Sequence, residues 1–508
     1  MRPVWIKLVI AGFINGLLCL GLWKLSLQFN WGEGHAERPI LEYLLLYLTL
    51  FAVYAWAVRL VLRSPPDPRL VWIVLGLGLC MRAALIPSQP IQEDDVYRYL
   101  WDGKVSGNGI NPYKYAPEQV TYFKQFMIRQ PERFARTYDA DSVRELEQLA
   151  ALKWENERAL VYMERINHPH LPTLYPPLAQ AVFRAVYHLA PDSIPAMRLA
   201  FGLFDLMTVG FLILLLKRLG MNPAWSLIWF WSPLVLKETY NSTHLDVIGI
   251  ACLTGSLYFL SSRRFAAACG SLALGVLGKL YPLILFPFYL KEAWRHLRAR
   301  GNGPAGRVIG CLAVFFGVLA LGYLPFVEPG TNPFGSLKTF STFWQSNDSL
   351  FALLVWVFRE GMGIEASGPV GWSYDLPSLL AKISAALLFG GVWTAFLLRP
   401  IPGPAAGEAP ALPLLRRLFI LMALVFLLSP VANPWYLCWV LPFLCLFPMR
   451  SWLLLTGLVG LYYLEFYFDY QEMPEYKTWI PWLEYLPFYI GLFWETRKKL
   501  FAILRPGA

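Results

Sequence analysis

The chain has 508 residues, of which 56% are hydrophobic and only 15% are charged, and its formal net charge is +10 at pH 7. Soluble domains carry about 25% charged residues, so this composition excludes an ordinary soluble protein. Apolar stretches close to the roughly 20 residues that a spanning helix needs recur along the chain. They predict an all-α polytopic membrane protein with about 13 to 14 transmembrane helices.

The N-terminal part, residues 1–92, contains three apolar stretches at 4–27, 40–62 and 70–86. The connection Arg59–Arg69 between the second and third stretches is basic, which is typical of a cytoplasmic loop. With a cytoplasmic N-terminus, the acids Glu93–Asp95 that follow the third stretch lie outside.

Residues 93–193 then form a long external segment, in which Tyr, Phe, Arg and Glu recur with helical spacing. This pattern predicts amphipathic helices lying on the membrane surface. Residues 194–398 are expected to form a central transmembrane bundle, with spans at 224–236 and 376–398 among others. A cytoplasmic linker rich in Pro, Gly and Ala follows at 399–413, and residues 414–508 form the C-terminal transmembrane helices, with one span at 435–447.

The excess of positive charge lies in short connections between apolar stretches, such as Lys291–Arg300 and Arg497–Lys499. This placement follows the positive-inside bias of membrane proteins, so we expect membrane lipids and no nucleic acid among the partners. Most of the seven cysteines fall inside apolar stretches, and none shows a metal-ligand spacing.

Three consecutive acids, Glu93, Asp94 and Asp95, stand at the external end of an apolar stretch and begin a short predicted helix that ends at Gly103. Acids suit a helix N-terminus because they complement its dipole, and one acid would suffice for that purpose. Three acids beside a membrane surface indicate that at least one is a general base or a cation ligand.

Polar and aromatic side chains of six distant segments gather at the same external face and predict a cavity there. The segments are 93–113, 167–177, 237–246, 279–282, 343–348 and 429–436. Their candidate binding residues are Arg98, Asn111, Tyr113, His168, His170, Tyr175, Lys237, His244, Lys279, Asn347, Trp435 and Tyr436.

These residue types suit different ligands. The guanidinium of Arg98 fits a phosphate, although an ion pair one turn away on its own helix is the simpler alternative. His168 and His170 lack further metal ligands nearby, so we expect hydrogen bonding to a sugar or phosphate. Asn111 belongs to a loop that Gly and Pro shape, and the rings of Trp435 and Tyr436 can stack on a sugar.

Five pieces of the sequence carry a resemblance to a known family: DDVYRYLWDG (94–103), GINPY (109–113), HPHLPTLYPPLAQ (168–180), GKLYPLILFPF (278–288) and SPVANPWYLCWVLP (429–442). With them the chain resembles membrane glycosyltransferases of the GT-C type, and most closely the bacterial polyprenol-phosphate-mannose-dependent mannosyltransferases. One departure is that two apolar helices precede the span leading into the acidic loop, whereas many relatives have none.

The resemblance implies a fold, a reaction and a set of roles. An inner-membrane enzyme would move a hexose, mannose-like by preference, from a polyprenyl-phosphate donor to a lipid or glycan acceptor on the external, periplasmic face, with inversion. The loop at 93–193 would carry the catalytic base, Asp95, with Asp94 as the competing assignment. The chemistry requires no cofactor and no metal, and a metal bridging the two aspartates stays an alternative.

The same resemblance divides the binding candidates. Donor phosphate binding falls to Arg98, Lys237, His244 and Lys279. Sugar or acceptor binding falls to Glu93, Asn111, Tyr113, His168, His170, Tyr175, Asn347, Trp435 and Tyr436.

Two other functions fit the same composition. A transporter or flippase of lipid-linked sugars would use a similar cavity but would place ionisable residues near the middle of its spans. A non-catalytic assembly subunit would tolerate replacement of the external acids. Because the ionisable residues concentrate at one face, the sequence favours the enzyme.

Overall fold

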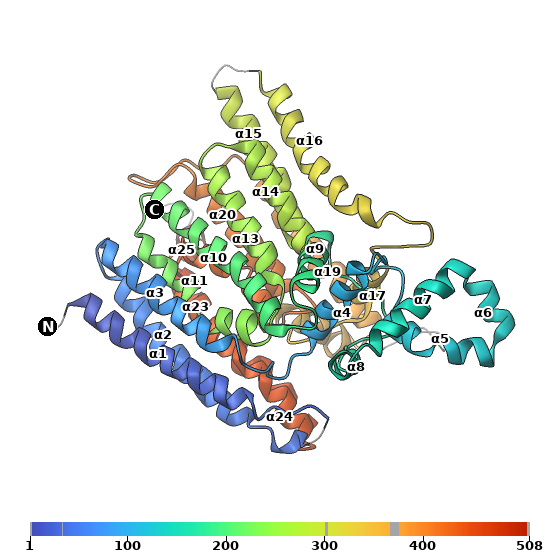
Figure 1. Cartoon of the computed structure of the whole chain (residues 1–508). Helices are drawn as coiled ribbons and strands as arrows, with labels where there is room; N and C mark the ends of the chain where they lie inside the picture. Colours follow the sequence, from blue (N-terminus) through green and yellow to red (C-terminus); the bar gives the residue numbers. More distant parts are fainter. Residues whose placement is uncertain (1–2, 33, 300–302, 366–374, 505–508) are drawn as a thin grey trace.

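The computed structural model describes residues 3–32, 34–299, 303–365 and 375–504, and the regular elements within these ranges are helices joined by loops (Figure 1). The described residues contain no strand, and one isolated parallel bridge pairs Ser346 with Val431. The all-α class predicted from composition is confirmed.

Seven helices or helical runs in the described ranges are long and apolar enough to cross a membrane. They are α1 (Val4–Ser26), α2 (Ile40–Leu62), α3 (Pro68–Leu85), α10 (Ile194–Arg218), α16 (Pro304–Tyr323), α19 (Leu376–Leu398) and the run α23, η7 and α24 (Arg450–Leu458, Val459–Tyr463 and Leu464–Tyr470). Many of their large apolar side chains are exposed, for example Leu45 and Leu387, as expected for helices that face lipid. The chain is therefore a multi-pass helical membrane protein.

Further helices pack among these seven. They are α13 (Asp246–Ser261), α14 (Phe265–Gly278), η4 (Tyr281–Leu285), α15 (Phe286–Ala299), η5 (Leu324–Phe326), α17 (Gly335–Phe343), α18 (Leu350–Trp356), η6 (Val357–Gly361), α20 (Leu412–Leu428), η8 (Pro474–Trp479) and α25 (Ile480–Leu504). α13 packs against both α10 and α14, and Gly278 allows the close approach because a Cβ there would lie 2.9 Å from the backbone nitrogen of Gly249.

Two of the predicted spans are not continuous helices, and that expectation is wrong. The stretch 224–236 falls within η2 (Pro223–Ser226), α11 (Leu227–Phe230), α12 (Pro233–Val235) and the π-helical turn η3 (Leu236–Asn241). The stretch 435–447 is divided between α21 (Pro434–Leu437) and α22 (Leu441–Leu444). Prolines begin several of these short helices, because a proline has no N–H to continue the helix before it. Both broken segments are almost completely buried, so other helices surround their irregular backbone.

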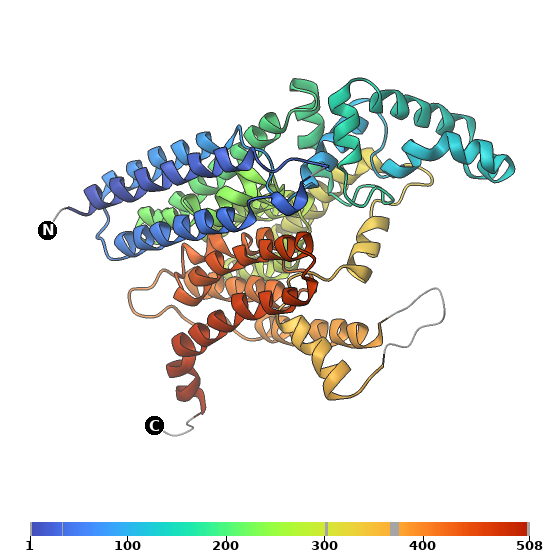
Figure 2. The same ribbon diagram turned by 90° about the horizontal axis from the view of Figure 1, so that it is seen from below.

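The segment 93–193 is helical, as predicted, but its first helix is buried. It comprises α4 (Asp95–Gly107), α5 (Pro117–Arg129), α6 (Pro131–Thr137), α7 (Ala140–Lys153), α8 (Glu157–Glu164) and α9 (Pro177–Leu189). All residues of α4 from Val96 to Ser106 are buried, and Gly103 lets α4 approach the backbone of Phe183 in α9. Figure 2 shows α5–α7 extending beyond the ends of the long helices. The buried start of α4 fixes the position of the three acids.

Candidate active site

A cavity of about 820 Å³ lies where α4 meets the loops that precede α9, η4, α18 and α21. Five of the six predicted segments contribute lining residues, and the segment 237–246 contributes none. We call one side of the cavity the polar wall, and its residues are Glu93, Asp95, Arg98, Asn167, His168, Lys279, Ser346 and Asn433. The segment 237–246 lies behind this wall. The predicted cavity at one end of the molecule is therefore present.

The structure separates the two candidate bases. Asp95, the first residue of α4, lines the cavity, and its side chain is 21% exposed. Its Oδ1 accepts a hydrogen bond from Asn167 at 2.7 Å, and its Oδ2 accepts one from the Tyr99 hydroxyl at 3.3 Å. These two donors orient the carboxylate and leave one side open to the cavity.

Asp94 points elsewhere. Its carboxylate pairs with Arg165 at 3.1 Å, and the Arg165 guanidinium lies over the ring of Tyr97. Burial raises the pKa of Asp94 above its ordinary value, and the charge of Arg165 counteracts that shift. Because Asp94 does not line the cavity and already has an ion-pair partner, the geometry favours Asp95 as the base.

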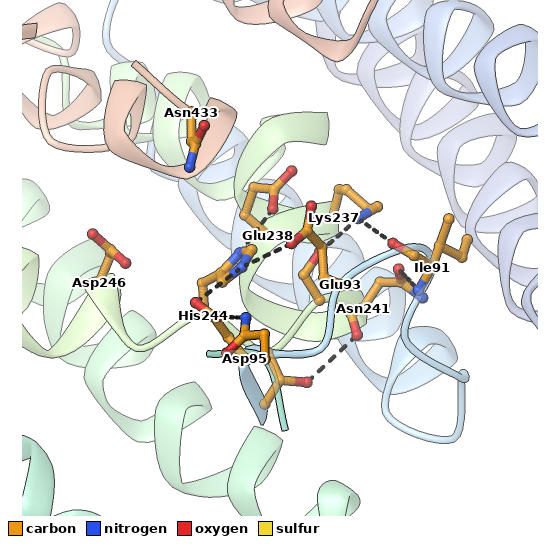
Figure 3. Close-up of polar contacts among 12 residues, drawn as sticks. Ile91, Glu93, Asp95, Lys237, Glu238, Asn241, His244, Asp246 and Asn433 are labelled. Carbon is orange, nitrogen blue, oxygen red and sulfur yellow. Dashed lines mark hydrogen bonds and ion pairs between the residues drawn. The ribbon is translucent and has the colours of Figure 1, made fainter. Parts of the chain in front are cut away.

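Beneath Asp95, a buried imidazole faces three carboxylates (Figure 3). His244 Nδ1 lies 2.9 Å from Glu238, and its Nε2 lies 3.7 Å from Glu93 and 3.9 Å from Asp95. Burial alone would lower the pKa of His244, but the hydrogen bond to Glu238 and the negative charges of Glu238 and Glu93 raise it to about 9. Burial raises the pKa of Glu93, against the attraction of His244. The imidazole is therefore a cation at neutral pH.

A single arginine holds the backbone on which this cluster is built. Arg198 in α10 is fully buried and donates to the carbonyl oxygens of Ile86, Ser88 and Asn241 and to the Thr243 hydroxyl. Thr243 has φ +66°, a conformation that costs a β-branched residue about 1–3 kcal/mol. Arg198 thus ties the loop before Glu93 to the turn before His244.

Lys279 lies at the opposite side of the polar wall. It follows α14 directly, and its ammonium pairs with Asp246 at 3.2 Å and lies over the Tyr436 ring at 4.9 Å. Asp246 also accepts a hydrogen bond from the Trp439 indole at 2.6 Å. The cation is therefore fixed, and it faces the cavity.

Aromatic rings cover the wall between these charged groups. Trp439 stacks on Tyr436 at 4.4 Å and on Tyr281 at 4.2 Å, while Trp435 stacks on the His244 imidazole at 3.9 Å. All four aromatic residues line the cavity. Such faces can bind the apolar face of a sugar ring.

The structure brings only part of the predicted phosphate-binding set to the cavity. Arg98 lines it, but its guanidinium already binds Asp102 at 2.8 Å and the Leu171 carbonyl at 3.0 Å. Lys237 is fully buried and donates to the Tyr463 hydroxyl at 2.8 Å. Neither Lys237 nor His244 lines the cavity, so Lys279 is the best placed of the four.

The sugar and acceptor candidates divide in the same way. Those that line the cavity are Glu93, His168, Tyr175, Trp435 and Tyr436, and those that do not are Asn111, Tyr113, His170 and Asn347. Asn111 donates to the Phe326 carbonyl and Glu328, the Tyr113 hydroxyl to the Tyr175 carbonyl, and Asn347 to Glu484. These three hold loops together.

Lys382, in the apolar helix α19, also lines the cavity and was not predicted. Its ammonium donates to the carbonyl oxygens of Ser341 and Thr342 at the end of α17. A lone cation within an apolar span was the available signal, because such residues are rare unless they serve a function. Tyr462 and Trp439 are further lining residues outside the predicted segments.

In the described part of the chain, no group of three or more His, Cys, Asp or Glu side chains is arranged to hold a metal ion. Comparison of the whole chain with family models, curated proteins and solved structures finds no match.

Proposed function

We propose that the protein is an integral membrane glycosyltransferase of the GT-C type. It transfers a hexose, mannose-like by preference, from a polyprenyl-phosphate donor to a lipid or glycan acceptor. The observation that carries the proposal is one cavity in which an oriented carboxylate, Asp95, and a fixed cation, Lys279, share a wall with aromatic rings.

The shape and chemistry of the cavity suit an amphiphilic donor. Opposite the polar wall, apolar side chains from α17, α18, α19 and α20 line it, namely Leu337, Phe340, Phe351, Ala385, Ala386, Phe389, Val425 and Leu428. A polyprenyl-phosphate sugar has a polar sugar, an anionic phosphate and an apolar chain in that order. The apolar lining accommodates the chain, and Lys279 binds the phosphate.

The reaction is a single displacement at the anomeric carbon. Asp95 removes the proton from an acceptor hydroxyl while the hydroxyl oxygen attacks that carbon from the side opposite the phosphate. The bond to the phosphate oxygen breaks, and the polyprenyl phosphate leaves with the electron pair and inversion of configuration. General-base assistance contributes about 10²–10⁴-fold to the rate. Lys279 stabilises the charge that grows on the leaving group. Arg98 holds the backbone of the same wall in place through its hydrogen bond to the Leu171 carbonyl.

The proposal includes a topology. The chain crosses the inner membrane about 13 to 14 times, with the cavity on the external, periplasmic face. The basic connections Arg59–Arg69 and Lys291–Arg300 and the acids Glu93–Asp95 support this orientation, since positive charge favours the cytoplasmic side.

One observation favours a second candidate, a flippase or transporter of lipid-linked sugars. Arg82 in α3 and Asp205 in α10 form a buried ion pair at 2.5 Å between two spans. Ionisable groups within spans are common in transporters. However, Trp229 and Tyr240 occupy the remaining acceptor positions of Asp205, and neither charged residue lines the cavity. The pair is therefore better explained as a link between helices.

The test is a transfer assay on the full-length protein in proteoliposomes. Short-chain polyprenyl phosphates carrying radiolabelled mannose, glucose or galactose serve as donors, and an extract of the native membranes serves as acceptor. We expect transfer from at least one donor, and Asp95→Asn should lower the rate by about 10²–10⁴-fold. Asp469→Asn, an exposed external acid paired with Lys477, is the matched control and should not change it.

The outcomes separate the candidates. Asp94→Asn should reduce the rate less than Asp95→Asn, since Asp94 faces Arg165. Undiminished transfer in Asp95→Asn would refute the general-base assignment. Movement of the labelled lipid across the bilayer without transfer of its sugar would favour the flippase.

A further inference from the structure

The polar groups around His244 are incompletely paired, although the residue is only 1% exposed. Its Nδ1 is bound to Glu238, whereas its Nε2 has no hydrogen-bond partner and faces Glu93 and Asp95 (Figure 3). The Oε1 atom of the buried Glu93 also lacks a partner. Buried polar atoms are nearly always hydrogen-bonded, so two unpaired atoms at one place indicate a function other than holding helices together.

We infer that His244, oriented by Glu238, is a positioning residue that places a fixed positive charge beneath Asp95 and keeps that carboxylate ionised. The inference rests on the proposed function, in which Asp95 takes a proton from the acceptor. It reassigns His244 from phosphate binding, because the ring stacks under Trp435 and does not line the cavity.

The need for such a charge follows from the neighbouring acid. Glu93 and Asp95 both lie within 4 Å of the same nitrogen, at 3.7 and 3.9 Å. Two carboxylates at one site disfavour each other's ionisation, and an adjacent cation reverses this effect. In the chemical step, the proton moves from the acceptor hydroxyl to Asp95, and His244 neither gains nor loses one.

The opposite side of the imidazole is held by a separate set of contacts. Glu238 accepts hydrogen bonds from the Tyr463 hydroxyl at 3.1 Å and from His244. Tyr463 in turn accepts from Lys237 at 2.8 Å. Glu238 thus has the Tyr463 hydroxyl as a second donor, and Lys237 holds that hydroxyl in place. The other imidazole nitrogen, Nε2, faces Glu93 and Asp95. The titratable groups that face this cluster from the packed elements are Glu93, Asp95, Lys237, Glu238, Lys279, Tyr436, Tyr462 and Tyr463.

The test is the pH dependence of kcat/KM in the transfer assay with the donor that the wild type uses. His244→Gln keeps a hydrogen-bonding side chain but removes the charge. An opposite charge at this distance shifts a carboxyl by about 1 to 3 pH units, so the acidic limb of the profile should move upward by that amount. The lost rate should return as the pH is raised. Glu238→Gln should move the limb in the same direction by less, and His188→Gln, an exposed histidine of α9, should not move it.

The outcomes distinguish a failure of this inference from a failure of the proposed function. A folded, active His244→Gln variant with an unmoved acidic limb would overturn the inference and leave the proposed function standing. If His244→Gln does not fold, an unmoved limb in Glu238→Gln has the same meaning, since that variant retains the imidazole. Absence of transfer by the wild type from every donor would overturn the proposed function itself, and the inference with it.

Discussion

Two buried clusters of charge lie in this bundle, and they differ in where their unpaired polar atoms lie. In the paired cluster, around Asp205, both carboxylate oxygens accept hydrogen bonds, one from Trp229 and the other from Arg82 and Tyr240. Arg82 Nη2 has no hydrogen-bond partner there, but neither Arg82 nor Asp205 lines the cavity. In the open cluster, around His244, an imidazole nitrogen and a Glu93 oxygen have no hydrogen-bond partner, and both Glu93 and Asp95 line the cavity. Burial of charge therefore does not by itself mark a site. Incomplete pairing next to a cavity does.

The largest expected effect is on the paired cluster and concerns stability. Asp205→Ala removes the acidic partner of Arg82, which is 3% exposed, and an uncompensated buried charge costs about 3–5 kcal/mol. We expect a large fall in the thermal stability of the detergent-solubilised protein. The double variant Arg82→Met with Asp205→Leu should recover much of the loss, because apolar groups replace the whole pair. Equal loss in the single and double variants would contradict the comparison.

The second effect is on the cavity that the open cluster adjoins, and it concerns the reaction. Lys279→Met removes the fixed cation of the cavity wall, and loss of one preorganised charge-stabilising group costs about 10²–10³ in kcat. Initial rates of sugar transfer measure this effect. Lys477→Met, which removes a lysine paired with Glu465 and Asp469 away from the cavity, is the matched control and should retain the wild-type rate. Similar rates in both variants would remove Lys279 from the site.

The third effect links the open cluster to pH. The folded-state pKa of His244 is raised to about 9 from an ordinary 6.5. Its protonation therefore stabilises the fold fully below pH 6.5, and this contribution is lost as the pH rises through 9. At 1.36 kcal/mol per unit, the loss is about 3 kcal/mol. Unfolding followed between pH 6 and pH 10 should show this decline in the wild type and a weaker one in His244→Gln. Parallel declines would place the titration on another group.

How far the sequence predicts this molecule depends on the range of the interactions involved. The helix at 376–398 was predicted with its observed ends, since an apolar run that contains a single charged residue, Lys382, and is bounded by charged residues determines it. The break within 224–236 was not predicted, because an apolar composition does not show that Pro233 starts a new helix or that a π-helical turn follows it. Hydrophobicity locates an apolar segment but does not show whether its helix is continuous.

The same limit applies to the site. The sequence predicted that six polar segments meet, and five line the cavity, because polar groups must gather where they avoid lipid. It could not separate Asp94 from Asp95, since their difference depends on Arg165, 71 residues away. Asn347 was counted as a ligand because its partner Glu484 lies 137 residues later in the chain. The roles of the lining residues stay predictions.

The smallest effect concerns Asp348, a buried carboxyl without an ion-pair partner among the described residues, which can be compared with Glu93 beside the His244 cation. Asp348 lies in the loop between α17 and α18, and burial raises its pKa from 3.8 to about 6, against hydrogen bonds from its own backbone N–H and from Gln345. A raised carboxyl pKa means that the folded state disfavours the ionised form. The stability is therefore greatest below pH 3.8 and is reduced as the pH rises through 6. Asp348→Asn keeps the acceptor for Gln345 and should stabilise the protein at pH 7.5 by about 3 kcal/mol, with no gain at pH 4. Thermal unfolding of both proteins at the two pH values measures the difference. A gain of the same size at pH 4 would show that packing, and not ionisation, is responsible, and Asp348 would then not serve as the unpaired counterpart of Glu93.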